Sequence, residues 1–363
     1  MSLNPYIKPK FGSTSAVMLD VIIALLPLSI ISIIAFGMLA LSLLLVATGT
    51  ALLTELVCAF LYTKNYKSIL DGSAIVTALL MCFTISPITP WYIVAFGAAA
   101  AIIFGKVVWG GLGKNRFNPA LVGREFMTTF YPVIMTSASI WATKSFVNTP
   151  SINLFSGLEH PFLSQYLNQL VYNTSGAMGE YSILAISLGG LYLLFKNRIS
   201  WHIPLALLAV FFLGFWLIDG GENYHFSLAG ILLGTIFMAT DMPSSPTNTN
   251  GKLYYGAMIG LVAFLLLLGN VSYEYMSFSI LILNGFSYLI SQAFKPKVWG
   301  KSINRKTQIE QLFFLTLAII GVTLSVITLN YYHLTAYVVY LYIIYIILKF
   351  NFSFSKKIFN PIQ

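Results

Sequence analysis

Charged side chains inside apolar segments are the residues of this sequence with the clearest capacity for chemistry. Arg124 and Glu125 lie well inside one such segment, Asp20 and Glu55 lie within two others, and Asp241 ends a fourth. An isolated charge in hydrocarbon is costly, so these residues must pair with one another or face a polar path. The residue types allow a structural ion-pair network, in which Asp20 and Glu55 are the expected partners of Arg124 and Glu125. They also allow a role in cation passage or in cofactor contact.

Two polar interruptions of the apolar segments are candidate binding sites. The first runs from 105 to 118 and combines glycines, cations and the Asn118-Pro119 step. Asn as a cap with Pro in the first turn is helix-start chemistry that explains the pair without a ligand, although a helix N-terminus also offers an anion site. The second surrounds Asp241, where a carboxylate, neighbouring hydroxyls and a proline-broken helix end coincide. That combination favours a functional role, and a turn cap is the alternative.

The composition defines the class of protein that must position these residues. Of the 363 residues, 58% are hydrophobic and only 9% are charged, against about 25% charged in soluble domains. These values indicate an all-α polytopic membrane protein without a separate soluble domain. Cys58 and Cys82 stand alone in apolar segments, so the chain by itself has no cysteine spacing for an iron–sulfur cluster or a zinc site.

Twelve apolar segments are candidate membrane spans. They are expected near residues 16–36, 39–63, 72–86, 89–108, 117–135, 181–196, 199–218, 226–241, 252–270, 276–294, 311–329 and 332–350. The third and eighth are short, and both end in proline-bearing turns. Short, interrupted spans at corresponding places of two halves are typical of a site formed by discontinuous helices near the membrane midplane.

The spans divide into two halves. Residues 1–135 and 181–295 each contain five spans, and because five is odd the second half enters the membrane inverted, which predicts an inverted repeat. An extracytoplasmic loop, 136–180, separates the halves. Residues 296–363 add a basic linker, a transmembrane hairpin and a tail.

The distribution of cations sets the expected orientation. With a cytoplasmic N-terminus, every lysine and arginine falls inside except Lys144, which falls outside, and Arg124, which lies within a span. The positive-inside rule therefore places both termini in the cytoplasm. The net charge of +9 is explained by this topology and does not point to nucleic acid as a partner.

Five blocks of the sequence, in order along the chain, carry a family resemblance. They are VMLDVIIALLP (17–27), DGSAIVTALLM (71–81), GGLGKNRFNPALVGREFM (110–127), GEYS (179–182) and FMATDMPSSPTNTNGKLYYG (237–256). Together they resemble the D subunit of Rnf-type electron-transport complexes and, more distantly, the B subunit of the sodium-translocating NADH:quinone oxidoreductase. The resemblance covers about residues 10–300 and leaves the last two spans outside. It implies a ten-helix inverted-repeat subunit of the bacterial cytoplasmic membrane.

The resemblance also implies flavin. In that family FMN is attached through its phosphate to a threonine in the outside loop between the fifth and sixth spans. The matching segment, TKSFVNTPSINL, places Thr149 at the acceptor position, with Thr143 as a second candidate. This segment departs from the family pattern, because Thr143 replaces an acidic residue, Phe146 a hydroxyl residue and Asn148 an alanine. Both threonines are also compatible with ordinary loop positions.

A second, non-covalent flavin is associated with the helical bundle of that family. The candidate contacts for it here are Asn118, Arg124 and Asp241. The cationic turn before Asn118 would then lie near the flavin or at a junction with another subunit. It is equally compatible with an inside loop that follows the positive-inside rule.

These features predict a membrane flavoprotein subunit that passes electrons through flavin and couples their flow to Na⁺ or H⁺ movement. The chain has no nicotinamide site and no iron–sulfur ligands of its own, so electrons must come from other membrane and peripheral redox subunits. It is expected to be a non-autonomous part of a translocase. Two alternatives remain, a small-solute channel or transporter, which the inverted repeat would also suit, and a flavin-poor scaffold subunit of the same fold.

Overall fold

The computed structural model of the chain describes residues 14–63, 66–141, 176–218, 226–271, 273–295 and 305–359. Across these ranges the ordered elements are helices, with no strand among them. Six of the described helices are long and apolar enough to cross a membrane, and further apolar helices are shorter. The predicted all-α polytopic membrane class is confirmed. Thr143 and Thr149 lie outside the described residues.

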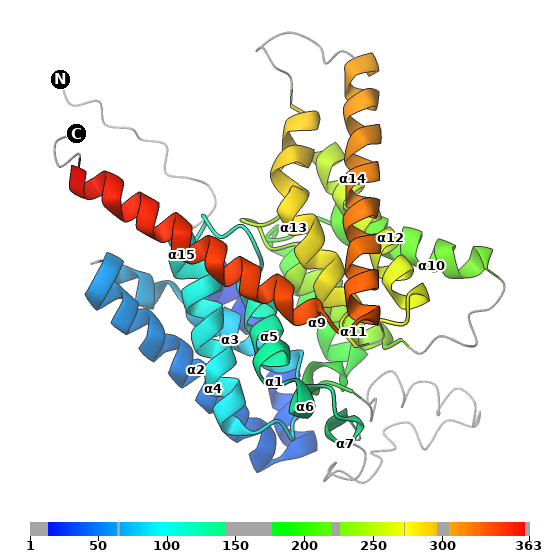
Figure 1. Cartoon of the computed structure of the whole chain (residues 1–363). Helices are drawn as coiled ribbons and strands as arrows, with labels where there is room; N and C mark the ends of the chain where they lie inside the picture. Colours follow the sequence, from blue (N-terminus) through cyan, green and yellow to red (C-terminus); the bar gives the residue numbers. More distant parts are fainter. Residues whose placement is uncertain are drawn as a thin grey trace, which may run out of the picture.

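The first half forms one group of helices, drawn from blue to cyan in Figure 1. Its spans are α1 (Thr14–Phe36), α2 (Met38–Cys58), α3 (Ser73–Phe83), α4 (Trp91–Ala100) and α5 (Pro119–Phe130). Two of them continue as π-helical turns, α2 through Ala59–Thr63 and α4 through Ala101–Lys106. The short helices α6 (Pro132–Met135) and α7 (Ala138–Trp141) follow α5.

The second half lies beside the first and is drawn from green to yellow in Figure 1. Its helices are α9 (Ile183–Phe195), α10 (His202–Leu217), α11 (Leu228–Leu233), α12 (Thr249–Leu268) and α13 (Tyr275–Ala293). A π-helical segment, Gly234–Met238, extends α11. The third and eighth spans are indeed short, since α3 has 11 residues and the helix of the eighth span covers only Leu228–Met238. The inverted relation between the halves stays a prediction.

Small residues let helices approach closely where the bundle is tightest. A Cβ at Gly123 of α5 would lie 2.6 Å from the backbone oxygen of Gly97 in α4. A Cβ at Gly256 of α12 would lie 2.5 Å from the backbone oxygen of Ile203 in α10. Without a hydrophobic driving force between helices in lipid, such close backbone packing is a main source of association. The contact at Gly123 fixes where α5 stands relative to α4, and α5 carries Arg124 and is capped by Asn118.

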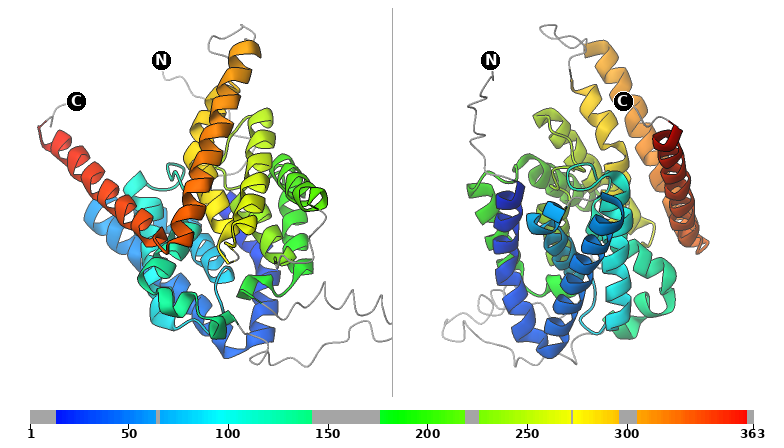
Figure 2. Two further views of the ribbon diagram at one scale, coloured as in Figure 1. Left: turned by 45° about the vertical axis from the view of Figure 1, so that its right-hand side comes forward. Right: turned by 90° about the vertical axis from the view of Figure 1, so that its left-hand side faces the viewer.

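The two C-terminal helices rejoin the bundle at different places. α14 (Arg305–Tyr331) packs on α12 and α13, whereas α15 (Thr335–Phe359) turns back to α5. Figures 1 and 2 show α15, in red, crossing the side of the first half. Tyr342 fixes this contact, because its hydroxyl accepts from Trp109 Nε1 at 3.0 Å and donates to the Phe104 carbonyl at 2.9 Å. The Lys349 ammonium lies 3.7 Å from the centre of the Trp109 ring.

Candidate functional site

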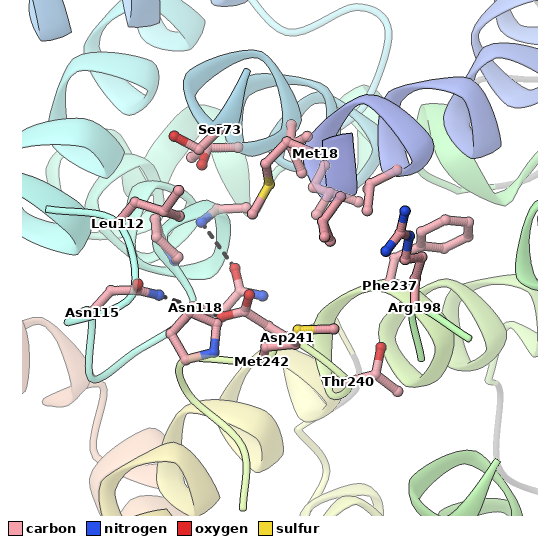
Figure 3. A pocket seen from close by; sticks show the side chains of 18 of the residues that line it. Met18, Ser73, Leu112, Asn115, Asn118, Arg198, Phe237, Thr240, Asp241 and Met242 are labelled. Carbon is pink, nitrogen blue, oxygen red and sulfur yellow. Dashed lines mark hydrogen bonds between the residues drawn. The ribbon is translucent and has the colours of Figure 1, made fainter. Parts of the chain in front are cut away.

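A pocket of about 260 Å³ lies between α1, α3, the segment that precedes α5 and the turn that follows the Gly234–Met238 segment. Its wall is mainly apolar, with side chains that include Val17, Met18, Val76, Leu80, Ile236 and Phe237. Polar groups enter from a few positions, namely Lys106, Asn115, Asn118, Arg198 and Asp241. Figure 3 shows Met18 and Ser73 along one wall and Thr240, Asp241 and Met242 along the facing one. A mainly apolar pocket with a few placed polar groups is the usual form of a small-molecule site.

Asn118 holds the start of α5 in place. Its Oδ1 accepts hydrogen bonds from the backbone N–H groups of Ala120 at 3.0 Å and Leu121 at 3.4 Å, with Pro119 in the first turn. Its Nδ2 donates to the Met238 carbonyl at 3.2 Å, where the π-helical segment of the second half ends. The helix-start interpretation is therefore confirmed, and the same side chain also ties the two halves together.

A second asparagine completes this junction. Asn284 of α13 accepts through Oδ1 from the Asn118 backbone N–H at 3.0 Å. Its Nδ2 donates to the Tyr255 hydroxyl at 2.7 Å and to the Ser244 carbonyl at 3.3 Å. Asn284 is fully buried, so these bonds meet the hydrogen-bonding need of a polar group in an apolar interior. Asn284 does not itself line the pocket, but through these bonds it holds Asn118, which does.

Asp241 contributes the carboxylate of the pocket. Ser244 Oγ donates to its Oδ2 at 2.8 Å, and Asn115 Nδ2 donates to the same oxygen at 3.4 Å. The first bond is the turn cap that the sequence allows, while the second joins Asp241 to the cationic segment of the first half, as drawn in Figure 3. The turn-cap interpretation of Asp241 is therefore confirmed. The residue also lines the pocket, and its functional role stays a prediction.

The ion pairs differ from those expected. Glu55 pairs with Lys106, whose Nζ lies 2.6 Å from Glu55 Oε1, and both side chains are only 3% exposed. Asp20 pairs with Arg198, whose Nε lies 2.7 Å from Asp20 Oδ2. The expectation that Asp20 and Glu55 neutralise Arg124 is therefore wrong. Lys106 and Arg198, the partners that the acids do find, line the same pocket as Asn118. Arg124 lies about 9 Å farther along α5, at 1.5 Å per residue, and therefore at a different depth in the bundle.

The burial of Lys106 is the feature of this site that sequence reasoning missed. The positive-inside rule counts Lys106 among the inside cations, and the structure shows that it ends a π-helical segment and is buried against Glu55 and Ser73. A signal was present, because Lys106 falls within the apolar segment 89–108. A lysine inside a span needs a buried partner in the same way as Arg124 does.

Arg124 belongs to a separate, smaller cavity of about 40 Å³. Its Nη2 donates to the backbone carbonyl of Tyr273 at 2.8 Å, in the segment that leads into α13. The structure therefore brings Asn118 and Asp241 together in one pocket and places Arg124 in another. Both cavities are lined by residues of α5 and of the eighth span. Ala120 and Phe237 line the larger one, and the adjacent Leu121 and Met238 line the smaller one.

The fold and these two cavities define a multi-pass helical membrane protein with polar sites beside short, interrupted helices. A family model described as the NQR2, RnfD, RnfE family matches residues 1–300. The chain belongs to this family, and α14 and α15 lie beyond the matched residues.

Characterised relatives extend this similarity over most of both chains. The D subunit of the Na(+)-translocating ferredoxin:NAD(+) oxidoreductase complex of Acetobacterium woodii is 35% identical over 303 residues, covering 83% of this chain and 95% of the relative. The D subunit of the proton-translocating ferredoxin:NAD(+) oxidoreductase complex of Clostridium ljungdahlii is 30% identical over 321 residues, covering 83% and 96%. The D subunit of an ion-translocating oxidoreductase complex of Stutzerimonas stutzeri is 30% identical over 337 residues, covering 81% and 94%.

Proposed function

We propose that this chain is the flavin-carrying membrane subunit of an ion-translocating electron-transport complex of the bacterial cytoplasmic membrane. The observation that supports this most strongly is the similarity, over nearly the full length of the relatives, to D subunits of ion-translocating oxidoreductase complexes. In this role the chain receives electrons from neighbouring redox subunits, and the complex couples their flow to movement of Na⁺ or H⁺. Both termini face the cytoplasm in this proposal.

The pocket suits the ring of a non-covalent flavin. A flavin ring is flat and apolar over much of its surface, with carbonyl and N–H groups along one edge. The volume of about 260 Å³ lies just below the roughly 300–1,000 Å³ of small-molecule sites. Asn115 and Asp241 offer an amide and a carboxylate beside each other in a mainly apolar pocket. These two residues would hold the polar edge, and a flavin bound there supplies one- or two-electron transfer.

The charged neighbours of the pocket shape its electrostatics without being free to bind a ligand. Lys106 and Arg198 are both engaged in ion pairs with Glu55 and Asp20. A phosphate group would have to compete with these carboxylates. The pocket therefore suits the ring portion of a flavin better than its phosphate.

Covalent FMN is proposed on Thr149 of the outside loop, with Thr143 as the second acceptor. The purified chain, run on a denaturing gel, should show flavin fluorescence in its own band, and Thr149→Val should abolish it. Thr143→Val serves as the matched control and should keep the signal. Loss in Thr143→Val alone would move the attachment to that residue. No fluorescence and no extractable flavin in the unaltered chain would exclude flavin and favour the scaffold alternative.

The non-covalent site has its own test. Acid extraction of the purified complex should release flavin, and Asn115→Ala should lower the amount released. Asn330→Ala in α14 is the control, because this residue does not line the pocket. Equal release from all three proteins would contradict flavin binding in the pocket. A solute flux in liposomes that needs no electron donor would favour the transporter alternative.

A further inference from the structure

A group of charged residues around Arg124 has no part in the electron path described above. Arg124 and Glu125 of α5 lie beside Glu180, which precedes α9, and Glu274, which precedes α13. Arg124 interacts electrostatically with all three carboxyl groups, and Glu125 interacts with Glu274. Arg124 and Glu125 are each only 8% exposed. Segments from both halves therefore bring one guanidinium and three carboxyl groups into electrostatic interaction, with Arg124 and Glu125 buried and Glu180 and Glu274 partly buried.

The charges of this cluster do not balance. With all groups ionised, three carboxylates and one guanidinium leave a surplus of two negative charges. In the part of the chain that the structure describes, the ion pairs within 4.0 Å belong to Lys106 and Arg198, and Arg124 forms none. A surplus of buried negative charge is unfavourable unless protons or a cation neutralise it.

Polar atoms in the cluster also lack partners. Arg124 Nε and Glu125 Oε1 are buried and have no hydrogen-bond partner among the described residues. Buried polar atoms of this kind are normally hydrogen-bonded, so two unpartnered atoms at neighbouring residues point to a polar ligand beside them. The Arg124 guanidinium donates to the Tyr273 carbonyl at 2.8 Å.

The cluster borders a space of suitable size. The cavity of about 40 Å³ is lined by Arg124 and Glu180, by two glycines, Gly230 and Gly234, and by apolar side chains; its other polar residues are Thr84, Tyr273, Tyr275 and Ser277. A single water needs roughly 10–15 Å³ of such volume, so a small cation with a water fits. A Cβ at Gly230 would lie 2.6 Å from Glu180 Oε1, so the missing side chain there makes room for the carboxylate.

The two carboxyl groups outside the spans are prone to hold protons. Burial raises the pKa of the Glu180 carboxyl and, although Arg124 opposes it, the pKa of the Glu274 carboxyl above the ordinary value. A group whose pKa is raised keeps its proton to higher pH, which lowers the surplus negative charge. This agrees with the geometry and is not needed for it.

We propose that Arg124, Glu125, Glu180 and Glu274 form a cation site that takes up Na⁺ or protons as part of ion translocation. The carboxylates provide attraction, and the Arg124 charge limits the affinity so that the bound cation can leave again. The site lies toward the outer side in the proposed topology, about two turns along α5 from the inner pocket. This inference rests on the proposed function, because only an ion-translocating complex needs such a site.

Infrared difference spectroscopy of the purified full-length chain in lipid tests the site directly. Exchange of NaCl for choline chloride at constant pH and ionic strength reports Na⁺ binding, and a pH titration in choline chloride reports protons. The carboxyl bands of the unaltered chain should respond to at least one exchange. Because the other carboxyl groups of the chain also respond to pH, Glu125→Gln should remove the Na⁺ response, or a larger part of the pH response than Glu310→Gln removes at an exposed position of α14. Glu274→Gln provides a second variant, and thermal unfolding checks that each variant is folded.

Every outcome decides the proposal. A Na⁺-dependent response that both cluster variants lose supports a sodium site, and a response to pH alone of which they lose a larger part than Glu310→Gln does supports a proton site. No response in the unaltered chain, or a response in folded Glu125→Gln and Glu274→Gln equal to that of Glu310→Gln, overturns it. Ion uptake by vesicles that hold the whole complex separates this from the proposed function. If the unaltered complex shows no electron-driven uptake, the proposed function fails, whereas normal uptake in both variants rejects the cluster alone.

Discussion

Removing the buried charge of Lys106 should destabilise the protein strongly. Lys106 Nζ lies 2.6 Å from Glu55 Oε1, both side chains are 3% exposed, and Asp71 lies 3.9 Å away. Lys106→Met leaves Glu55 buried beside a second carboxylate without a cation. Breaking a buried ion pair by removing one partner costs about 3–5 kcal/mol. At about 1.4 kcal/mol per tenfold change, this is a roughly 100- to 5,000-fold shift of the unfolding equilibrium.

A second substitution should restore most of this loss. Lys106→Met combined with Glu55→Leu removes both charges, and replacing a buried pair by apolar residues is often neutral or stabilising. The assay is unfolding in mixed micelles with rising sodium dodecyl sulfate, followed by tryptophan fluorescence. The exposed Lys114 gives the control, because Lys114→Met should stay within about 0.5 kcal/mol of the unaltered protein. If Lys106→Met is as stable as Lys114→Met, or the double variant is no more stable than Lys106→Met, the reasoning is refuted.

Two further predictions concern packing. Gly123→Ala should cost about 1–3 kcal/mol by overpacking, because its Cβ would lie 2.6 Å from a backbone oxygen of α4. Gly49→Ala is the control, because no atom lies within 4 Å of the new Cβ, and it should be neutral or stabilise α2 by up to about 1 kcal/mol. The same micelle titration compares the two variants, and equal effects would contradict the close packing of α5 on α4. Tyr342→Phe loses the bonds to Trp109 and the Phe104 carbonyl, each worth about 0.5–1.5 kcal/mol. Trp109 fluorescence should shift and proteolysis of α15 should accelerate, while the exposed Tyr337→Phe should do neither.

The sequence predicts local structure here better than it predicts partners. The start of α5 follows from Asn118 and Pro119, because a cap and a first-turn proline act within a few residues. The short third span likewise follows from the glycine before it and the proline turn after it. Asp241 is recognisable because its turn places a carboxylate among hydroxyls at the end of a short span. These are local properties that a single segment carries by itself.

The partners of the buried charges depend on more than local sequence. Glu55 pairs with Lys106 and not with Arg124. The pairing requires that the helices carrying the two residues pack at matching depth with the two side chains facing each other, and neither segment determines this by itself. The cluster around Arg124 is assembled from segments far apart in the chain, including Glu180 and Glu274 before later helices. The carboxylates near Arg124 are set by how α5 packs against α4 in its own half and against α13 in the other half. The close approach of Gly123 to α4 contributes to that packing.

The similarity to relatives that translocate different ions bears on the cation site. One relative is named for Na⁺ and another for protons, at 35% and 30% identity. A shared fold therefore does not determine which ion is moved, since fold and function are separable. The infrared experiment with Glu125→Gln tests which of the two ions the proposed cluster takes up in this chain.

The contact between α15 and α5 has a consequence for the order in which the protein is made. α5 leaves the ribosome and enters the membrane long before α15 is synthesised, because α15 is the last described helix of the chain. Until then, the face of α5 that carries Phe126 lacks its contact with Tyr342 of α15. α15 therefore covers this surface of α5 late in synthesis, and a ribosome that stops before residue 335 leaves the surface uncovered.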